Sequence, residues 1–197
     1  MIGNDIIDLQ LALKESNWQR PRFLQKIFTL EEQSFLATAP NKNKAVWLLW
    51  SRKESAYKII ARQKQNRFFA PKKLANIFNA NNFWATDGQV KFEQFTIFTK
   101  STMTDRYIHT VAQMSDYWKA FAVNSFNLRQ QNYTCQHQTT RQQLIADYAE
   151  RNNYSATKLT IKKDEWKIPH LYYNNRRQSV MLSIAHHGFF GGYVYQL

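Results

Sequence analysis

The chain has 197 residues, 44% of them hydrophobic and 15% aromatic, so it can bury a core and is not of the disordered class. Its 27 lysines and arginines against 14 acidic residues give a net charge of +13, which predicts anionic partners such as nucleic acid, anionic lipid, nucleotides or an acidic protein. The single cysteine, Cys135, excludes an internal disulfide framework and a cysteine-rich zinc site.

The amino terminus has neither the basic region nor the apolar run of a signal peptide. No apolar stretch approaches the length that spans a membrane. We therefore expect a reduced, soluble, cytoplasmic protein that does not bind membranes.

The chain begins with a predicted strand over residues 1–9, whose apolar pattern contains Asp5. Such an acidic residue usually lies on the exposed face, and the alternative is a buried carboxylate held by a metal. A short helix is predicted over residues 21–27. The sequence from Thr29 to Glu32 is a capping box, which starts another helix that ends near Thr38.

A long helix is predicted from about Asn43 to Gln63, because its apolar residues have helical spacing and no proline or glycine interrupts it. Glu54 and Lys58 are four residues apart and therefore lie on one face of this helix. The same side carries aromatic residues, beside which an unpaired carboxylate is costly. From spacing alone, a surface ion pair between Glu54 and Lys58 is the favoured interpretation, since such pairs are common on helices.

The second part of the chain is predicted to be mostly β. Residues 107–114 and 117–126 are predicted to form a hairpin, residues 127–140 are polar and predict a linker, and a helix is expected from Arg141 to about Asn152. Other strands are predicted around residues 92–98, 159–161, 168–173, 180–185 and 193–197. The segment 73–77 resembles 158–161, which indicates a weak internal repeat.

Paired histidines occur near the carboxy terminus, at His186 and His187. Side chains alternate between the faces of a strand, so adjacent histidines rarely bind one metal ion. We therefore favour one histidine as a hydrogen-bond donor to phosphate.

The string Trp50-Ser51-Arg52-Lys53-Glu54-Ser55-Ala56-Tyr57-Lys58 resembles the signature helix of the 4'-phosphopantetheinyl transferase superfamily. The resemblance implies that Glu54 binds a catalytic magnesium ion and that Lys58 contacts the phosphates of coenzyme A. Residues Ile2-Gly3-Asn4-Asp5 resemble the family's G-x-D motif, which makes Asp5 the second magnesium ligand. Mg²⁺ prefers such oxygen ligands. Where one branch of the family has a third carboxylate this chain has Ile7, so water is expected there.

Two strings near the carboxy terminus extend the resemblance. Leu182-Ser183-Ile184-Ala185-His186-His187-Gly188 resembles the family's S-x-S-H-S-G strand end, which implies that His186 contacts the diphosphate of coenzyme A, with Ser183 beside it. Lys167-Ile168-Pro169 resembles the G-K-P motif imperfectly. Lys167 is expected to supply the missing cation from a shifted position.

The motif order differs from that of the surfactin-type transferases, in which the last two motifs come first, and a circular permutation explains the difference. The short trimeric holo-acyl-carrier-protein synthases share the order found here but are much shorter. The resemblance implies an α+β fold with two pseudo-symmetric halves, each a small antiparallel sheet packed on a long helix. The halves are residues 1–126 and 141–197, joined by a linker at 127–140. Because both would contribute to one site, we expect a monomer.

The implied reaction transfers 4'-phosphopantetheine from coenzyme A to a serine of an acidic acyl or peptidyl carrier protein, depends on Mg²⁺ and releases 3',5'-ADP. The serine proton goes either to Glu54 or to a metal-bound water. One alternative is a nucleic-acid-binding module, since basic and aromatic residues interleave over 64–73. That alternative lacks a known motif and leaves Asp5 and Glu54 unexplained. The other alternative is a non-catalytic family member, suggested by the altered Lys167-Ile168-Pro169.

Overall fold

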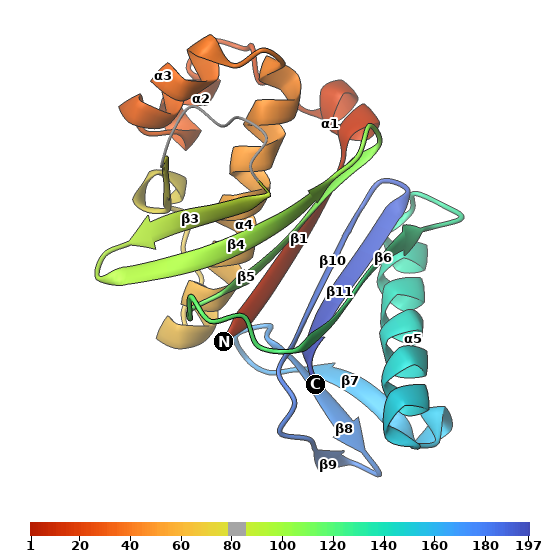
Figure 1. Ribbon diagram of the computed structural model, residues 1–197. Coiled ribbons are helices and arrows are strands. Elements are labelled where there is room, and N and C mark those ends of the chain that lie inside the picture. The colour runs from red at the N-terminus through yellow and green to blue at the C-terminus, as the bar shows by residue number, and fades with distance from the viewer. Residues whose placement is uncertain (79–85) are drawn as a thin grey trace.

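The structure is a computed structural model that describes residues 1–78 and 86–197. It is an α+β protein in which two antiparallel sheet systems each carry one long helix, as Figure 1 shows. The first half contains β1 (Ile2–Asp8), α1 (Leu9–Glu15), α2 (Phe23–Ile27), α3 (Leu30–Thr38), α4 (Lys42–Lys64), β2 (Ala75–Ile77), β3 (Asp87–Phe92), β4 (Phe95–Met103) and β5 (Tyr107–Gln113). The second half contains β6 (Phe121–Asn127), α5 (Tyr133–Asn152), β7 (Leu159–Lys163), β8 (Pro169–Tyr173), β9 (Arg176–Arg177), β10 (Leu182–His187) and β11 (Phe190–Gln196).

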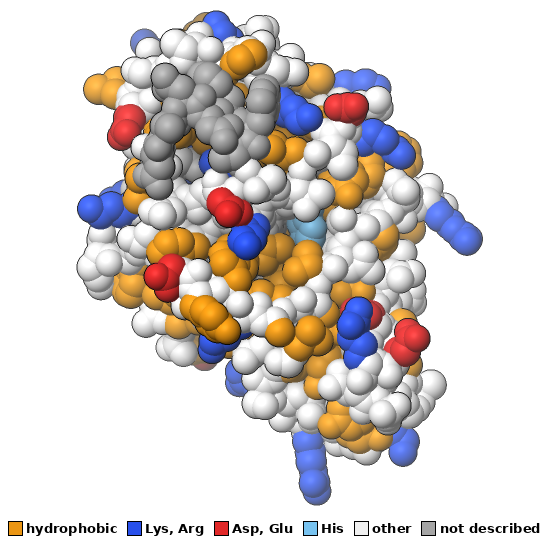
Figure 2. All heavy atoms as spheres, in the orientation of Figure 1, with side chains coloured by type: hydrophobic (Ala, Val, Ile, Leu, Met, Phe, Trp, Pro, Cys, Tyr) orange, Lys and Arg blue, Asp and Glu red, His pale blue; other side chains and the backbone are white. Residues whose placement is uncertain are grey.

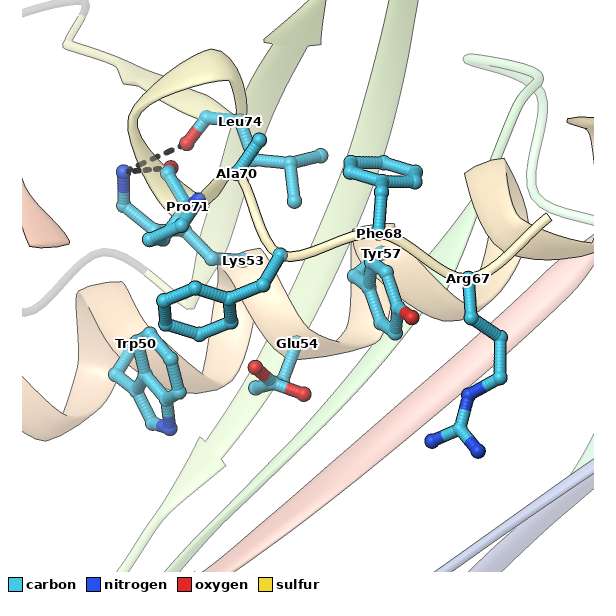
Figure 3. Close-up of a pocket in the computed structure, with 10 residues that line it drawn as sticks. Trp50, Lys53, Glu54, Tyr57, Arg67, Phe68, Ala70, Pro71 and Leu74 are labelled. Carbon is cyan, nitrogen blue, oxygen red and sulfur yellow. Dashed lines mark hydrogen bonds between the residues drawn. The ribbon is translucent and has the colours of Figure 1, made fainter.

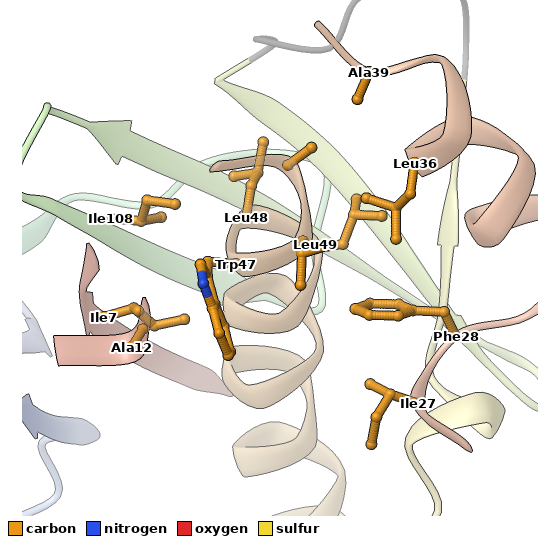
Figure 4. Close-up of a cluster of buried hydrophobic side chains, with 12 residues drawn as sticks. Ile7, Ala12, Ile27, Phe28, Leu36, Ala39, Trp47, Leu48, Leu49 and Ile108 are labelled. Atoms are coloured by element: carbon orange, nitrogen blue, oxygen red, sulfur yellow. The ribbon is translucent and has the colours of Figure 1, made fainter. Parts of the chain in front are cut away.

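Helix α4 is the central element of the first half. Asn41 caps its amino end by accepting a hydrogen bond from the backbone N–H of Lys44, and Gln65 ends it in the left-handed conformation. Its apolar side packs between α3 and the sheet, as the buried cluster in Figure 4 shows. Burying each large side chain of this cluster contributes about 1.5–3 kcal/mol, so packing stabilises α4 more than intrinsic propensity does.

The strands of the first half form a five-stranded sheet in the order β1-β5-β4-β3-β2 within the described residues. Strand β1 pairs with β5 from Ile2 opposite Gln113 to Asp8 opposite Tyr107. It also contacts α4 on one side and strands β10 and β11 on the other. The strand that carries Asp5 is therefore the element at which the two halves meet.

The second half repeats this plan. Strands β10, β11 and β6 form one sheet, β7, β8 and β9 form another, and α5 packs on them over a core that includes Leu144, Leu171 and Tyr195. The order β6-β11-β10 corresponds to β1-β5-β4, and α5 corresponds to α4. A 3-10 turn precedes both β2 and β7, which are the segments whose sequences resemble each other.

Three sequence predictions differ from the structure. The hairpin of residues 107–114 with 117–126 does not form, because β5 pairs with β1 and β4 whereas β6 pairs with β11 in the second half. Most of the predicted linker is helical, since α5 begins at Tyr133 after the N-cap Asn132. Asp8 also ends β1 and caps α1, a helix that the sequence pattern did not predict.

None of the helices in the described residues is long and apolar enough to cross a membrane.

Candidate functional site

The two halves enclose a cavity of about 640 Å³ beside the middle of α4. Helix α4 forms one wall, strand β10 and the segment from β7 to β8 form others, and the first turns of α5 close it. Five of the six predicted site residues line it together: Glu54, Lys58, Lys167, Ser183 and His186. The sixth, Asp5, contacts this group through Lys58.

Lys58 connects the elements around the cavity. Its ammonium group donates a hydrogen bond to the backbone carbonyl of Asn4 and lies 3.8 Å from the Asp5 carboxylate and 3.4 Å from the carbonyl of Ile184 on β10. The side chain is 30% exposed, so the charge is still accessible from the cavity. Lys58 therefore holds β1 and β10 at one point and presents a cation there.

Asp5 and Glu54 bring two carboxylates to the site from β1 and α4. Burial raises the pKa of Asp5 above its usual value, although the nearby Lys58 opposes the shift. Burial, and then the negative charge of Asp5, raise the pKa of Glu54 to about 7. The two groups therefore repel each other in an environment that disfavours their charge.

The close approach of β1 to α4 depends on Gly3. A Cβ atom at this position would lie 2.2 Å from the backbone carbonyl oxygen of Ser55, so a side chain there would force the strand away from the helix. This contact explains why a glycine stands two residues before Asp5.

The Asp5 and Glu54 pair fits a magnesium ion. Mg²⁺ is usually held by one or two carboxylates together with waters and substrate phosphates, and a cation would relieve the repulsion between these two. Ile7 is buried in the core between β1 and α4 and supplies no ligand. In residues 1–78 and 86–197 there is no group of three or more His, Cys, Asp or Glu side chains that could hold a metal ion.

His186 lies in the cavity as a neutral imidazole. Its Nδ1 is 2.9 Å from Oε1 of Gln136, whose amide nitrogen donates to the carbonyl of Gly188, so Nδ1 must be the donor to Gln136. Burial first, and then neighbouring cationic groups, lower the pKa of His186 to about 4. The Nε2 atom carries the lone pair and is the remaining polar atom of the ring.

His187 has different surroundings, as the alternation of side chains along a strand predicts. Its Nδ1 accepts a hydrogen bond of 2.9 Å from the backbone N–H of Asp8, and its Nε2 lies 3.7 Å from Glu15. His187 does not line the cavity. Ser183 lines it while its hydroxyl oxygen accepts the backbone N–H of Asn4 at 3.1 Å, which leaves the hydroxyl hydrogen to donate elsewhere.

Several cations of the cavity were not identified from the sequence. Arg62, Arg67, Arg141 and Lys163 line it beside Lys58 and Lys167. Burial first, and then Arg141, Arg67, Lys167 and Lys58, lower the pKa of Lys163. Such crowding of positive charge is relieved by a polyanion. Arg141 was missed because the predicted helix began at this residue, whereas α5 begins two turns earlier and places Arg141 within the helix beside the cavity.

A second cavity, of about 430 Å³, lies on the other side of Glu54 and is shown in Figure 3. Trp50 and Tyr57 of α4 and Phe68 and Phe69 of the following loop give it aromatic walls. It shares three residues with the larger cavity, namely Glu54, Tyr57 and Arg67.

A buried ion pair supports the wall of this second cavity. The ammonium group of Lys53 donates to Glu32 at 2.8 Å and to the carbonyls of Pro71 at 2.8 Å and Leu74 at 2.7 Å, and Figure 3 shows the last two bonds. The other oxygen of Glu32 accepts two hydrogen bonds from Asn76. The pair therefore fixes residues 71–74, which follow the aromatic loop formed by residues 66–70.

Comparison with known proteins agrees with this geometry. A family model described as the 4'-phosphopantetheinyl transferase superfamily matches residues 1–122, which is more than half of the chain and includes Asp5, Glu54 and Lys58. The search of curated proteins found no match. The match and the arrangement of these residues lead to one conclusion: the chain belongs to the 4'-phosphopantetheinyl transferase superfamily.

Proposed function

We propose that this protein is a holo-acyl-carrier-protein synthase that transfers 4'-phosphopantetheine from coenzyme A to a serine of an acyl or peptidyl carrier protein. The observation that carries the proposal is the cation-lined cavity beside Glu54. Arg141, Lys163 and Lys58 offer charge-assisted hydrogen bonds to the phosphates of a nucleotide. An enzyme that only needed to bind an acidic protein would not require these cations inside a cavity.

In the proposed reaction the hydroxyl oxygen of the carrier serine attacks the β-phosphorus of coenzyme A. The new P–O bond forms as the bond to 3',5'-ADP breaks, and the bonding electron pair leaves on the oxygen of that product. The serine proton goes to a base, either Glu54 or water. Lys58, Ser183 and the lysines and arginines of the cavity hold the phosphates in position.

Asp5 and Glu54 would hold the magnesium ion, which supplies neutralisation of the diphosphate charge when bound. Without a cation, the same two carboxylates would repel the diphosphate. Lys167 is proposed to contact a phosphate as well, from a residue whose φ of 66° lies in the left-handed region.

The surface suits an acidic carrier protein. The net charge is +13, and Figure 2 shows more basic than acidic side chains on the face in view. Such a field raises the rate of encounter with an acidic partner and is screened by salt.

We also propose a monomer, because residues of both halves line one cavity within a single chain. Sedimentation equilibrium is expected to give the mass of one chain. A trimer that persists at low concentration would contradict this expectation.

Mass spectrometry of an apo carrier protein incubated with coenzyme A, Mg²⁺ and this protein tests the proposal. The expected result is a gain of one phosphopantetheine on the carrier and release of 3',5'-ADP. Binding of coenzyme A without any gain on a panel of acyl and peptidyl carriers would instead indicate a non-catalytic member. Binding of single-stranded nucleic acid but not of coenzyme A would favour the nucleic-acid alternative.

A further inference from the structure

Arg67 lies where the two cavities meet. It belongs to the loop between α4 and the 3-10 turn at Pro71–Lys73, and it lines both cavities together with Glu54 and Tyr57. Figure 3 shows its guanidinium on the same side of α4 as the Glu54 carboxylate. A ligand that extends from one cavity into the other must pass these three side chains.

The guanidinium of Arg67 lacks a hydrogen-bond acceptor or carboxylate partner among residues 1–78 and 86–197. No carboxylate or carbonyl of the described part of the chain accepts a hydrogen bond from it, and its side chain is exposed where it lines the cavities. Two neighbouring cations on α4 differ in this respect: Arg62 donates to the carbonyl of Leu182 at 2.8 Å, and Lys58 donates to the carbonyl of Asn4. The donors of Arg67 are therefore available to a ligand.

The loop that carries Arg67 is anchored on both sides. Before it, the backbone N–H of Asn66 donates to the carbonyl of Ala61 on α4. After it, the ring of Phe68 packs on Tyr57 with a centroid distance of 5.2 Å, and Lys53 holds the carbonyl of Pro71. The guanidinium is thus presented from a fixed backbone, which lowers the cost of orienting it in the reaction.

The chemistry of the two cavities defines which atoms reach this junction. The larger cavity is rich in cations and suits the nucleotide phosphates, whereas aromatic walls of the smaller one suit an uncharged chain. In a donor that combines both parts, the phosphorus that joins them would therefore lie beside Glu54 and Arg67, which line both cavities.

We propose that Arg67 binds the non-bridging oxygens of the phosphoryl group during its transfer. This inference rests on the proposed function. As the serine oxygen bonds to phosphorus and the ADP oxygen departs with its electron pair, negative charge is spread over the equatorial and leaving oxygens. A planar guanidinium can donate two parallel hydrogen bonds to such oxygens, which a lysine cannot.

Steady-state kinetics of Arg67→Ala and Arg67→Lys, with Lys73→Ala as the matched control, test the proposal. Lys73 belongs to the following turn, is exposed and lines neither cavity. Lys73→Ala removes one positive charge, as Arg67→Ala does, but removes it outside the cavities. Loss of a preorganised donor lowers kcat by about 10²-fold, so Arg67→Ala is expected to show a fall of this size at saturating coenzyme A and carrier. Arg67→Lys is expected to recover part of it, and Lys73→Ala to match the wild type.

Three results would overturn the inference, and they separate it from the proposed function. If Arg67→Ala keeps the wild-type kcat, or changes only the KM for the carrier, Arg67 acts through the general field alone. If Arg67→Lys is as active as the wild type, two-point binding by the guanidinium is wrong. If the wild type itself transfers nothing, the proposed function fails, and this inference fails with it.

Discussion

Asp5 and Glu54 are residues whose environment disfavours the charge that their proposed role requires. Both are partly buried, burial raises the pKa of each, and the charge of Asp5 raises the pKa of Glu54 further. Proteins rarely keep such pairs without a neutralising charge. Lys58 supplies one positive charge 3.8 Å from Asp5, and a bound metal ion would add more, so the two side chains support the proposed magnesium site.

Glu54→Gln is expected to abolish transfer and to leave the fold intact. The substitution keeps the size of the side chain and removes the charge that would hold Mg²⁺, and it also removes the repulsion with Asp5. The melting temperature should therefore equal or exceed that of the wild type. Glu93→Gln, which affects an exposed ion pair with Lys64, is the control. Transfer by Glu54→Gln at saturating Mg²⁺ would contradict the role.

His186→Ala is expected to weaken coenzyme A binding and to slow transfer, at a cost of about 1.5–3 kcal/mol if one charge-assisted hydrogen bond is lost. His187→Ala should affect coenzyme A binding much less, because His187 lies outside the cavity and bonds to the Asp8 backbone. Paired titrations of the two variants measure the difference. A larger loss of affinity in His187→Ala than in His186→Ala would show that His187, and not His186, faces the coenzyme A site.

Coenzyme A binding is expected to take up a proton at His186. In the free protein the pKa of this imidazole is about 4, and Nε2 can donate to phosphate only when it is protonated. An anion raises the pKa again, so affinity should fall as the pH rises from about 4 to the pKa of His186 in the complex, and should be constant above that pKa. Calorimetry in buffers of different ionisation enthalpy measures the uptake, which should disappear in His186→Ala.

At the scale of elements, the buried Lys53 and Glu32 pair joins α3, α4 and the segment that ends the aromatic loop. Lys53 is 1% exposed and Glu32 is fully buried, so removal of either partner leaves an unpaired charge inside the protein. The pair contributes to the position of the loop on which Phe68 and Arg67 lie.

Lys53→Met is expected to destabilise the protein by about 3–5 kcal/mol, since it leaves Glu32 buried without its cation. The double replacement with Glu32→Gln should cost clearly less than the sum of the two single changes. Denaturant unfolding of the four proteins gives the coupling free energy. Additive effects would show that the two side chains are energetically independent.

At the scale of the whole molecule, His109 lies at the junction of the two halves. The Nε2 atom of His109 is 3.1 Å from the side-chain nitrogen of Asn4 on β1. A Cβ atom added to Gly192 of β11 would lie 2.9 Å from the same Nε2 atom, so the imidazole packs closely against β11. Burial first, and then the nearby Lys58, lower the pKa of His109 to about 4. The junction is therefore built around a neutral histidine.

Stability is expected to fall as the pH decreases from about 6.5 to about 4, because the unfolded chain then binds a proton that the folded His109 does not. The lowered pKa of His109 corresponds to a decrease of about 3 kcal/mol in the free energy of unfolding across this pH window. His109→Gln should reduce the slope of unfolding free energy against pH, although His186 contributes in the same range. An unchanged slope would mean that His109 is protonated in the folded protein.

The sequence by itself determined the long helix α4, the capping box of α3 and the three motifs that indicated the family. These features are local: helical spacing without glycine or proline, a four-residue cap, and short strings of residues. Tertiary structure decided which strands pair. Residues 117–126 are predicted to pair with 107–114, yet β6 pairs with β11, because both edges of β5 are already occupied by β1 and β4.

Tertiary structure also decided where α5 begins and which cations surround the site. Residues 133–140 lack an apolar stripe, and they are helical because contacts such as those of Gln136 with His186 and Gly188 stabilise them. Arg67, Arg141 and Lys163 are far apart in sequence and carry no motif of their own. Only the packing of the two halves brings them to one cavity, because side-chain proximity across the chain depends on the fold and not on spacing.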